Sequence, residues 1–311
     1  MGTIQTKGWE LAIDYRHTFK NGLHFGVTAS VADDKTEVTK WTYNTKIPSY
    51  GATGWWDKSA YKEGMVLGDI WGLQFDRFLT EDDFNADGSL KAGLPDQTKV
   101  FPAGYQFAPG DVLYKDLDNN GEIVKQTNTN DKGDLSVIGN ALPRLQFGLN
   151  LDAAWKGFDI SMFFQGVAKR KLWAAGNQVL PGFTTGEPFY KGAEDYWTPE
   201  NTDAFYPRPM DYKQSASGNY SVNDRYLLNM AYLRLKTFTV GYSLPKVWLS
   251  KFKVQGLRVY FTGENLFTID GVKPAIDPEI GIRTASGKSD QRNFGRSYPY
   301  QKTVSFGIQL S

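Results

Sequence analysis

The chain has 311 residues, with 35 Lys and Arg against 34 Asp and Glu, which gives a formal net charge of +1. This balance argues against a nucleic-acid-binding protein, which would carry a basic excess. The sequence contains no Cys, which excludes a disulfide scaffold, a zinc–thiolate site and a Cys nucleophile. Aromatic residues make up 15% of the chain and 32 residues are Gly, a composition that favours β-rich structure with long polar loops.

The N-terminal segment is polar. Residues 1–8 lack the apolar core of a secretory signal peptide. No stretch of the sequence approaches the roughly 18–20 consecutive apolar residues of a membrane helix. We therefore expect either a cytoplasmic protein or a chain that lacks its natural N-terminus, and the pattern of strands decides between the two.

Alternation of apolar and polar residues predicts a first strand over residues 9–19 and a second from residue 23 to at least residue 31. Between them, Asn21-Gly22 is a strong signal for a hairpin turn. The apolar side chains of the first strand share one face, which carries Trp9, Leu11, Ile13, Tyr15 and Phe19. Such alternation is typical of a strand with one apolar face and one polar face.

The same alternation returns further along the chain. It covers residues 143–155, turns at Lys156-Gly157 and continues over residues 158–165. A third hairpin spans about residues 229–268, where the apolar positions switch from odd to even near Lys236-Thr237, which predicts a β-bulge. A last strand alternates over residues 303–310, which brings the number of expected strands to seven.

The length of these strands and the lengths of their connections indicate a membrane barrel. Strands of about 12 residues exceed the usual ~5–6 and suit the ~9–11 tilted residues that cross a bilayer. We expect short connections near 20–22, 156–157 and 244–255, and long ones at about 44–142, 169–228 and 269–297. Transmembrane barrels have short turns at one side and long loops at the other. A soluble β-sheet protein, the alternative, has no reason to sort its loops in this way.

Several segments resemble the C-terminal part of a SusC/RagA-type TonB-dependent outer-membrane transporter. The residues that carry the resemblance are those from Tyr232 to Pro245, Leu257 to Tyr260, Gly263 to Thr268, Gly110 to Gly121, Val137 to Asn140, Leu145 to Asn150 and Gly157 to Gly166. They follow the order and the approximate spacing that are typical of the family, and together they span nearly the whole chain.

This resemblance implies an all-β fold, a partial transmembrane antiparallel β-barrel of about seven long strands from a 22-stranded barrel. Residues 1–311 would form its C-terminal portion, with short periplasmic turns and long extracellular loops. The signal sequence, the TonB-contacting segment and the plug domain would be absent from this chain. Seven strands alone would leave two unpaired edges, which cannot stand in lipid.

The resemblance also implies a function. We expect active nutrient import at the bacterial outer membrane, with TonB-dependent uptake of glycans or else peptides, and no enzyme activity. The expected partners are a SusD-like surface lipoprotein, the TonB complex through the missing N-terminal part, the cargo and membrane lipid, but no nucleic acid. The alternatives are a passive porin-like barrel and a soluble β-rich carbohydrate-binding module.

One loop segment resembles the start of a calcium-binding loop. Oxygen ligands at Asp116, Asp118 and Asn120 precede Gly121, whose position suits a sharp turn, and the backbone carbonyl of Glu122 is the next expected ligand. Asp134 is the candidate for the missing last carboxylate. The sequence thus predicts a structural Ca²⁺ here and no required cofactor, and the alternative is a polar surface turn.

Aromatic residues of the long loops are candidates for contact with cargo. Trp55, Trp56 and Trp197 could stack on sugar rings, and the alternative is packing within ordered loops. Tyr260, Thr262 and Glu264 alternate with apolar residues and are expected to face the lumen. His17 and His24 belong to no catalytic motif, and the sequence shows no phosphate-cradling loop.

Overall fold

A computed structural model describes residues 2–42, 63–128, 131–174, 176–183, 188–210, 218–250, 254–273, 276–280 and 300–311. Its main feature is a seven-stranded antiparallel sheet in the order β1-β2-β9-β10-β13-β14-β15. The strands are β1 Thr3–Thr18, β2 His24–Lys40, β9 Arg144–Trp155, β10 Phe158–Lys169, β13 Tyr232–Ser243, β14 Leu257–Asp270 and β15 Thr303–Leu310. The prediction of seven long antiparallel strands is confirmed.

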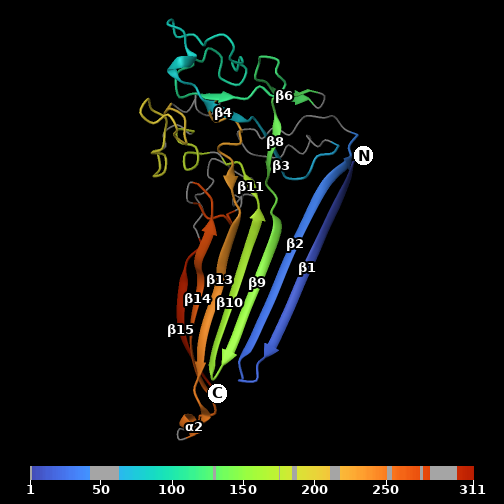
Figure 1. Cartoon of the computed structure of the whole chain (residues 1–311), viewed down its shortest axis with the longest axis vertical. Coiled ribbons are helices and arrows are strands. Elements are labelled where there is room, and N and C mark those ends of the chain that lie inside the picture. The colour runs from blue at the N-terminus through green and yellow to red at the C-terminus, as the bar shows by residue number, and fades with distance from the viewer. Residues whose placement is uncertain are drawn as a thin grey trace.

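The connections between these strands are sorted by side (Figure 1). One end of the sheet carries the turn after β1, the turn after β9 and the connection between β13 and β14, which holds the short helix α2 Lys246–Leu249. The first two turns use Gly22 and Gly157 in the left-handed region, with φ of 81° and 88°. The described parts of all three long connections lie at the opposite end.

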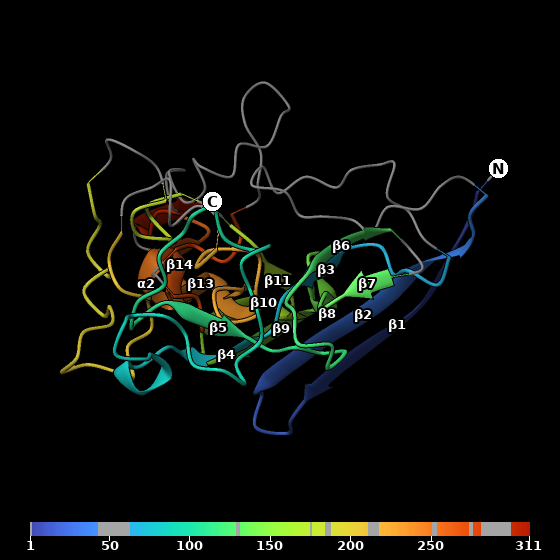
Figure 2. The same cartoon turned by 90° about the horizontal axis from the view of Figure 1, so that it is seen from above.

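The long connections carry small two-stranded sheets of their own. These pair β3 Asp69–Gly72 with β8 Ser136–Asn140, β4 Phe75–Phe78 with β5 Val112–Tyr114, β6 Lys125–Asn128 with β7 Asp131–Gly133, and β11 Lys171–Leu172 with β12 Leu228–Asn229. A 3₁₀ turn, η2 Glu81–Asp83, lies between β4 and β5. Seen from above, these connections lie over one end of the seven-stranded sheet (Figure 2).

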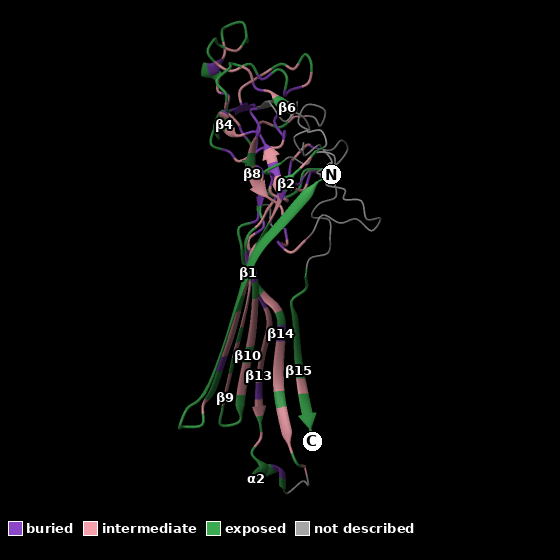
Figure 3. Cartoon of the chain, turned by 90° about the vertical axis from the view of Figure 1, so that its right-hand side faces the viewer, coloured by how far each residue is buried: buried purple, intermediate pink, exposed green. Residues whose placement is uncertain are grey.

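The hydrophobic core lies mainly in these connections and not in the sheet. One cluster of buried residues draws on all three long connections through Ile70, Trp173, Leu180, Tyr206, Tyr226, Val272 and Ile276. A second cluster contains Leu73, Val112, Tyr114, Ile123 and Trp197. Buried residues gather at the loop end, whereas the long strands are mostly exposed or intermediate (Figure 3). The loops therefore form an ordered cap.

Strand register places apolar and polar residues on opposite faces of the sheet. One row of paired positions crosses six strands as Phe25, Ala153, Ile160, Val240, Phe261 and Phe306. The next row is Gly26, Asp152, Ser161, Thr239, Thr262 and Ser305. Because side chains alternate across a strand, the two rows lie on different faces. The apolar face is open to its surroundings, and Phe306 is 82% exposed.

The predicted β-bulge near Lys236-Thr237 is confirmed. The register between β13 and β14 shifts between Leu235 and Thr237, and that between β10 and β13 shifts at Phe163. Asn265, on the facing strand β14, adopts the left-handed conformation with φ of 51°. The extra residue restores the alternation, so Leu235 and Phe238 lie on the same apolar face although their spacing is odd.

The two outer strands of the sheet have one neighbour each. Among the described residues, β1 pairs with β2 alone and β15 pairs with β14 alone. Sheet edges with free backbone groups do not stand in hydrocarbon. The sheet is therefore an arc of a larger barrel, as its apolar face also indicates.

Within the described ranges, no helix is long and apolar enough to cross a membrane.

Candidate functional site

The polar face of the sheet carries hydrogen bonds and ion pairs that cross between strands. The Arg258 guanidinium of β14 reaches over β13 to Asp159 of β10, with Nε to Oδ1 at 3.0 Å and Nη2 to Oδ2 at 2.5 Å. It passes above Gly241, where an added Cβ would lie 2.5 Å from Arg258 Nη2. A side chain at this position would require the guanidinium to shift. The sequence places these charges on the face opposite the apolar row, where they bind one another.

Tyr260, Thr262 and Glu264, which were expected to face the lumen, all lie on this polar face. The Tyr260 ring covers Gly307 of β15, and the Arg258 guanidinium lies 5.0 Å from its centroid. Thr262 Oγ1 lies 3.2 Å from Thr239 Oγ1, and Glu264 pairs with Thr237 and Thr303 in the register. Tyr260 and Thr262 thus contact neighbouring residues of the sheet.

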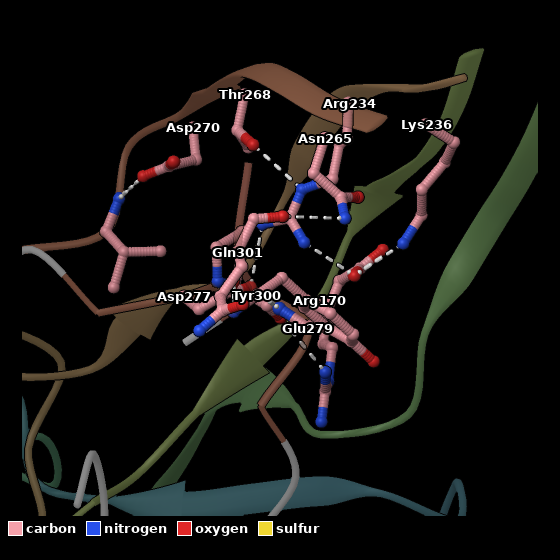
Figure 4. A network of polar contacts seen from close by, with 12 residues as sticks. Arg170, Arg234, Lys236, Asn265, Thr268, Asp270, Asp277, Glu279, Tyr300 and Gln301 are labelled. Carbon is pink, nitrogen blue, oxygen red and sulfur yellow. Dashed lines mark hydrogen bonds and ion pairs between the residues drawn. The ribbon is translucent and has the colours of Figure 1, made fainter. Parts of the chain in front are cut away.

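The loop end of the same face holds a buried network of charges (Figure 4). Arg234 of β13 is 4% exposed in its side chain and binds two carboxylates, Asp277 Oδ1 at 2.8 Å and Glu279 Oε2 at 2.7 Å. Its Nε also donates to Thr268 Oγ1 at 2.8 Å. Lys236 Nζ lies 2.7 Å from the same Glu279 oxygen. The pairs satisfy one another where water is excluded.

This network holds the described part of the last long connection against the seven-stranded sheet. The Tyr300 ring lies under both cations, 5.2 Å from the Arg234 guanidinium and 4.8 Å from Lys236 Nζ. Arg170 Nη1 donates to the Pro278 carbonyl at 3.4 Å. Residues 276–280 are thereby held against the polar face. The sequence pattern does not predict this site, although the acidic pair Asp277 and Glu279 in the predicted loop is a signal for it.

The three carboxylates of the predicted calcium loop converge. One oxygen from each of Asp116, Asp118 and Asp134 lies within 4.8 Å of the others. Asp134 is fully buried and accepts backbone N–H groups from Leu117 at 2.8 Å and Val124 at 2.7 Å. Loss of solvation and the nearby Asp134 and Asp116 carboxylates raise the pKa of Asp118. The loop therefore brings the carboxylates of Asp116, Asp118 and Asp134 close together.

The other two predicted ligands are engaged elsewhere through their side chains. Asn120 Oδ1 accepts the Glu122 N–H at 2.7 Å, and its Nδ2 donates to Asp118 Oδ2 at 3.1 Å. The Glu122 carboxylate forms an ion pair with Lys99. Asp116 accepts the Gly121 N–H at 2.8 Å, and this hydrogen bond lowers the pKa of Asp116. Hydrogen bonds from backbone N–H groups to side-chain oxygens of the same segment thus stabilise the turn.

The three tryptophans expected to contact cargo have different outcomes. Trp55 and Trp56 lie outside the described residues. The prediction for Trp197 needs correction, since this side chain is only 7% exposed and packs in the second loop cluster. Its ring lies against Gly110, where an added Cβ would come within 2.5 Å. A ring enclosed in this way has no open face for a sugar.

The chain was compared with known proteins. No family model matches it. It is 26% identical over its full length to TonB-dependent receptors P3 and P26 of Formosa agariphila, and 25% identical over 74% of its length to TonB-dependent receptor SusC of Bacteroides thetaiotaomicron. The RagAB peptide transporter matches 99% of the chain with a TM-score of 0.65 and 19% sequence identity, which supports the fold.

Over its full length the chain is similar to TonB-dependent receptors, and this similarity agrees with the SusC/RagA-type resemblance seen in the sequence. It spans 29% of the length of the two Formosa receptors and 22% of SusC. The family and the outer-membrane localisation predicted from the sequence are confirmed. The relatives are named as receptors and a transporter, which fits the expectation that this protein is not an enzyme. The outer-membrane localisation argues against the soluble carbohydrate-binding module.

Proposed function

We propose that the receptor imports nutrients actively across the outer membrane and that this chain provides part of the barrel wall and its surface loops. The observation that carries the proposal is similarity to TonB-dependent receptors from end to end of the chain. The division of the sheet into an apolar and a polar face supports a wall between lipid and lumen. Binding from outside and release into the periplasm need no covalent change in the cargo.

In this proposal the capped end of the sheet faces outside. The three long connections are extracellular, and the turns at residues 20–22, 156–157 and 244–255 are periplasmic, as in other outer-membrane barrels. The two apolar loop clusters support this arrangement, because they give the loops an ordered structure that a cargo or a partner can recognise. A SusD-like surface lipoprotein would cap the barrel, and the TonB complex would supply energy.

Glycans are the first candidate for the cargo and peptides the second. One structural neighbour is named a peptide transporter, and one sequence relative is named SusC. Because the sequence identity to these proteins is low, their names do not show whether this receptor imports glycans or peptides. A transport measurement is therefore needed to identify the cargo class.

The test uses the native bacterium and strains lacking either this receptor gene or TonB. Uptake of fluorescently labelled oligosaccharides and labelled peptides is measured separately in each strain. We expect one cargo class to enter the wild type and to be excluded from both deletion strains. Uptake that requires the receptor but persists without TonB would instead establish the passive porin-like barrel.

A further inference from the structure

A cavity lies in the connection between β10 and β13, apart from the polar face and the carboxylate loop. Its volume is about 680 Å³, within the ~300–1,000 Å³ usual for small-molecule sites. Aromatic and proline side chains dominate its lining, which includes Phe189, Tyr190, Tyr196, Tyr206, Pro207 and Tyr220. Among the described residues, none of the site residues predicted from the sequence lines it.

The floor of this cavity is rigid. Tyr206 and Tyr220 are both buried in the first loop cluster. The Tyr206 hydroxyl donates to the Val179 carbonyl at 3.0 Å, and its ring stacks on Tyr226 with centroids 6.0 Å apart. Burial raises the pKa of Tyr206 to about 12, so its hydroxyl stays protonated as a donor. Pro207 in the lining further restricts the backbone.

The rim of the cavity offers open aromatic rings. Phe189 is 59% exposed and Tyr196 is 41% exposed, and Tyr190 lies beside them in the lining. Tyr196 precedes the buried Trp197 in a segment that bridges to Tyr206. Because neighbouring side chains of an extended segment point to opposite sides, burying Trp197 turns Tyr196 toward the cavity.

We propose that this cavity binds sugar rings of a neutral oligosaccharide, an inference that rests on the proposed import function. Pyranose rings have apolar C–H faces that pack on aromatic rings and hydroxyl groups that bind phenol oxygens. The charged residues among the described lining are Lys191 and Glu194, whose charges cancel, so a multiply charged ligand gains little. None of the described lining residues belongs to a strand, so an extended peptide finds no strand edge to join.

The test is calorimetry on the receptor purified in detergent from the native bacterium. The probes are maltohexaose, cellohexaose, xylohexaose and mannohexaose, with a proline-rich peptide as the competing class. We expect at least one hexaose to bind and Tyr196→Ala to weaken it about tenfold or more. Tyr196→Phe, which keeps the ring, should retain most of the affinity. Trp248→Ala, an exposed aromatic in α2 at the other end of the sheet, should change nothing.

The proposal is overturned if no hexaose binds, if Tyr196→Ala and Phe189→Ala leave hexaose affinity unchanged, or if these changes weaken the peptide alone. Uptake measured in the same strains distinguishes failure of the cavity proposal from failure of the proposed import function. Import that needs TonB but is indifferent to Tyr196 leaves the proposed function standing without this site. Import that is independent of TonB refutes the proposed function whatever the cavity binds.

Discussion

Arg234 Nη1 donates to Glu279 Oε2 at 2.7 Å, joining the loop end of strand β13 to a loop segment 45 residues further along the chain. Both side chains are almost fully buried. This pair and its neighbour Asp277 hold residues 276–280 against the polar face of the sheet.

Removing Arg234 should release this segment. Arg234→Met removes the ion pairs to two buried carboxylates and leaves the Lys236 pair with Glu279, and breaking a buried pair costs about 3–5 kcal/mol. We expect faster hydrogen exchange at residues 276–280 in the purified receptor. Adding Asp277→Asn and Glu279→Gln to the same variant should restore much of the protection. Unchanged exchange in Arg234→Met would show that other contacts hold the segment.

The two faces of β9 should respond differently to a new charge. Leu149 and Asn150 are neighbours halfway along the strand and lie on opposite faces, with Leu149 paired to Ala29 and Asn150 to Thr28. A Lys on the lipid side near the bilayer midplane costs about 2–4 kcal/mol. Leu149→Lys should therefore reduce the amount of receptor assembled in outer membranes, and Asn150→Lys should not. Equal assembly of both variants would contradict the assignment of faces.

These faces could be predicted from the sequence, since a period of two fixes which side chains share a side before any tertiary contact is known. Trp197 and the Arg234 network could not be predicted in this way. The burial of Trp197 depends on packing against Gly110, 87 positions away, and the two carboxylate partners of Arg234 lie 43 and 45 residues further along the chain. Irregular loops carry no periodic signal that reports such distant contacts.

The loop around η2 should lose stability in acid. Arg77 binds Asp83 through two hydrogen bonds of 2.6 and 2.7 Å, and this pairing lowers the pKa of Asp83 from 3.8 to about 2. A lowered carboxyl pKa stabilises the folded loop above the unfolded value, and this contribution is lost between about pH 4 and pH 2. At neutral pH it amounts to about 2 kcal/mol.

Asp83→Asn should remove this contribution and speed hydrogen exchange across residues 79–91 at neutral pH. The difference from wild type should shrink as pH falls toward 2. Asp82→Asn, which changes the exposed neighbour, is the matched control and should behave as wild type. An equal effect of the two substitutions would show that the Arg77 pair does not stabilise the loop.

The calcium prediction remains open to a direct test. The convergence of Asp116, Asp118 and Asp134 supports a proposed structural Ca²⁺, and extracellular sites of this kind bind at ~10⁻⁴–10⁻³ M. Calorimetry with millimolar Ca²⁺ should show binding to the receptor that Asp116→Asn with Asp118→Asn abolishes. Asp87→Asn, in another loop turn, serves as control. Identical titrations of wild type and the double variant would show that this segment is a polar surface turn and not a calcium site.

The central claim is that this sheet is an outer-membrane wall with its long loops outside. The chain contains no Cys, so single Cys substitutions introduce unique labels within it. Ala92 is exposed in the first long connection and Lys20 is exposed in the first short turn. In intact bacteria, a maleimide that does not cross membranes should label Ala92→Cys and should reach Lys20→Cys only after the outer membrane is permeabilised. Equal labelling of both positions in intact cells would contradict the account.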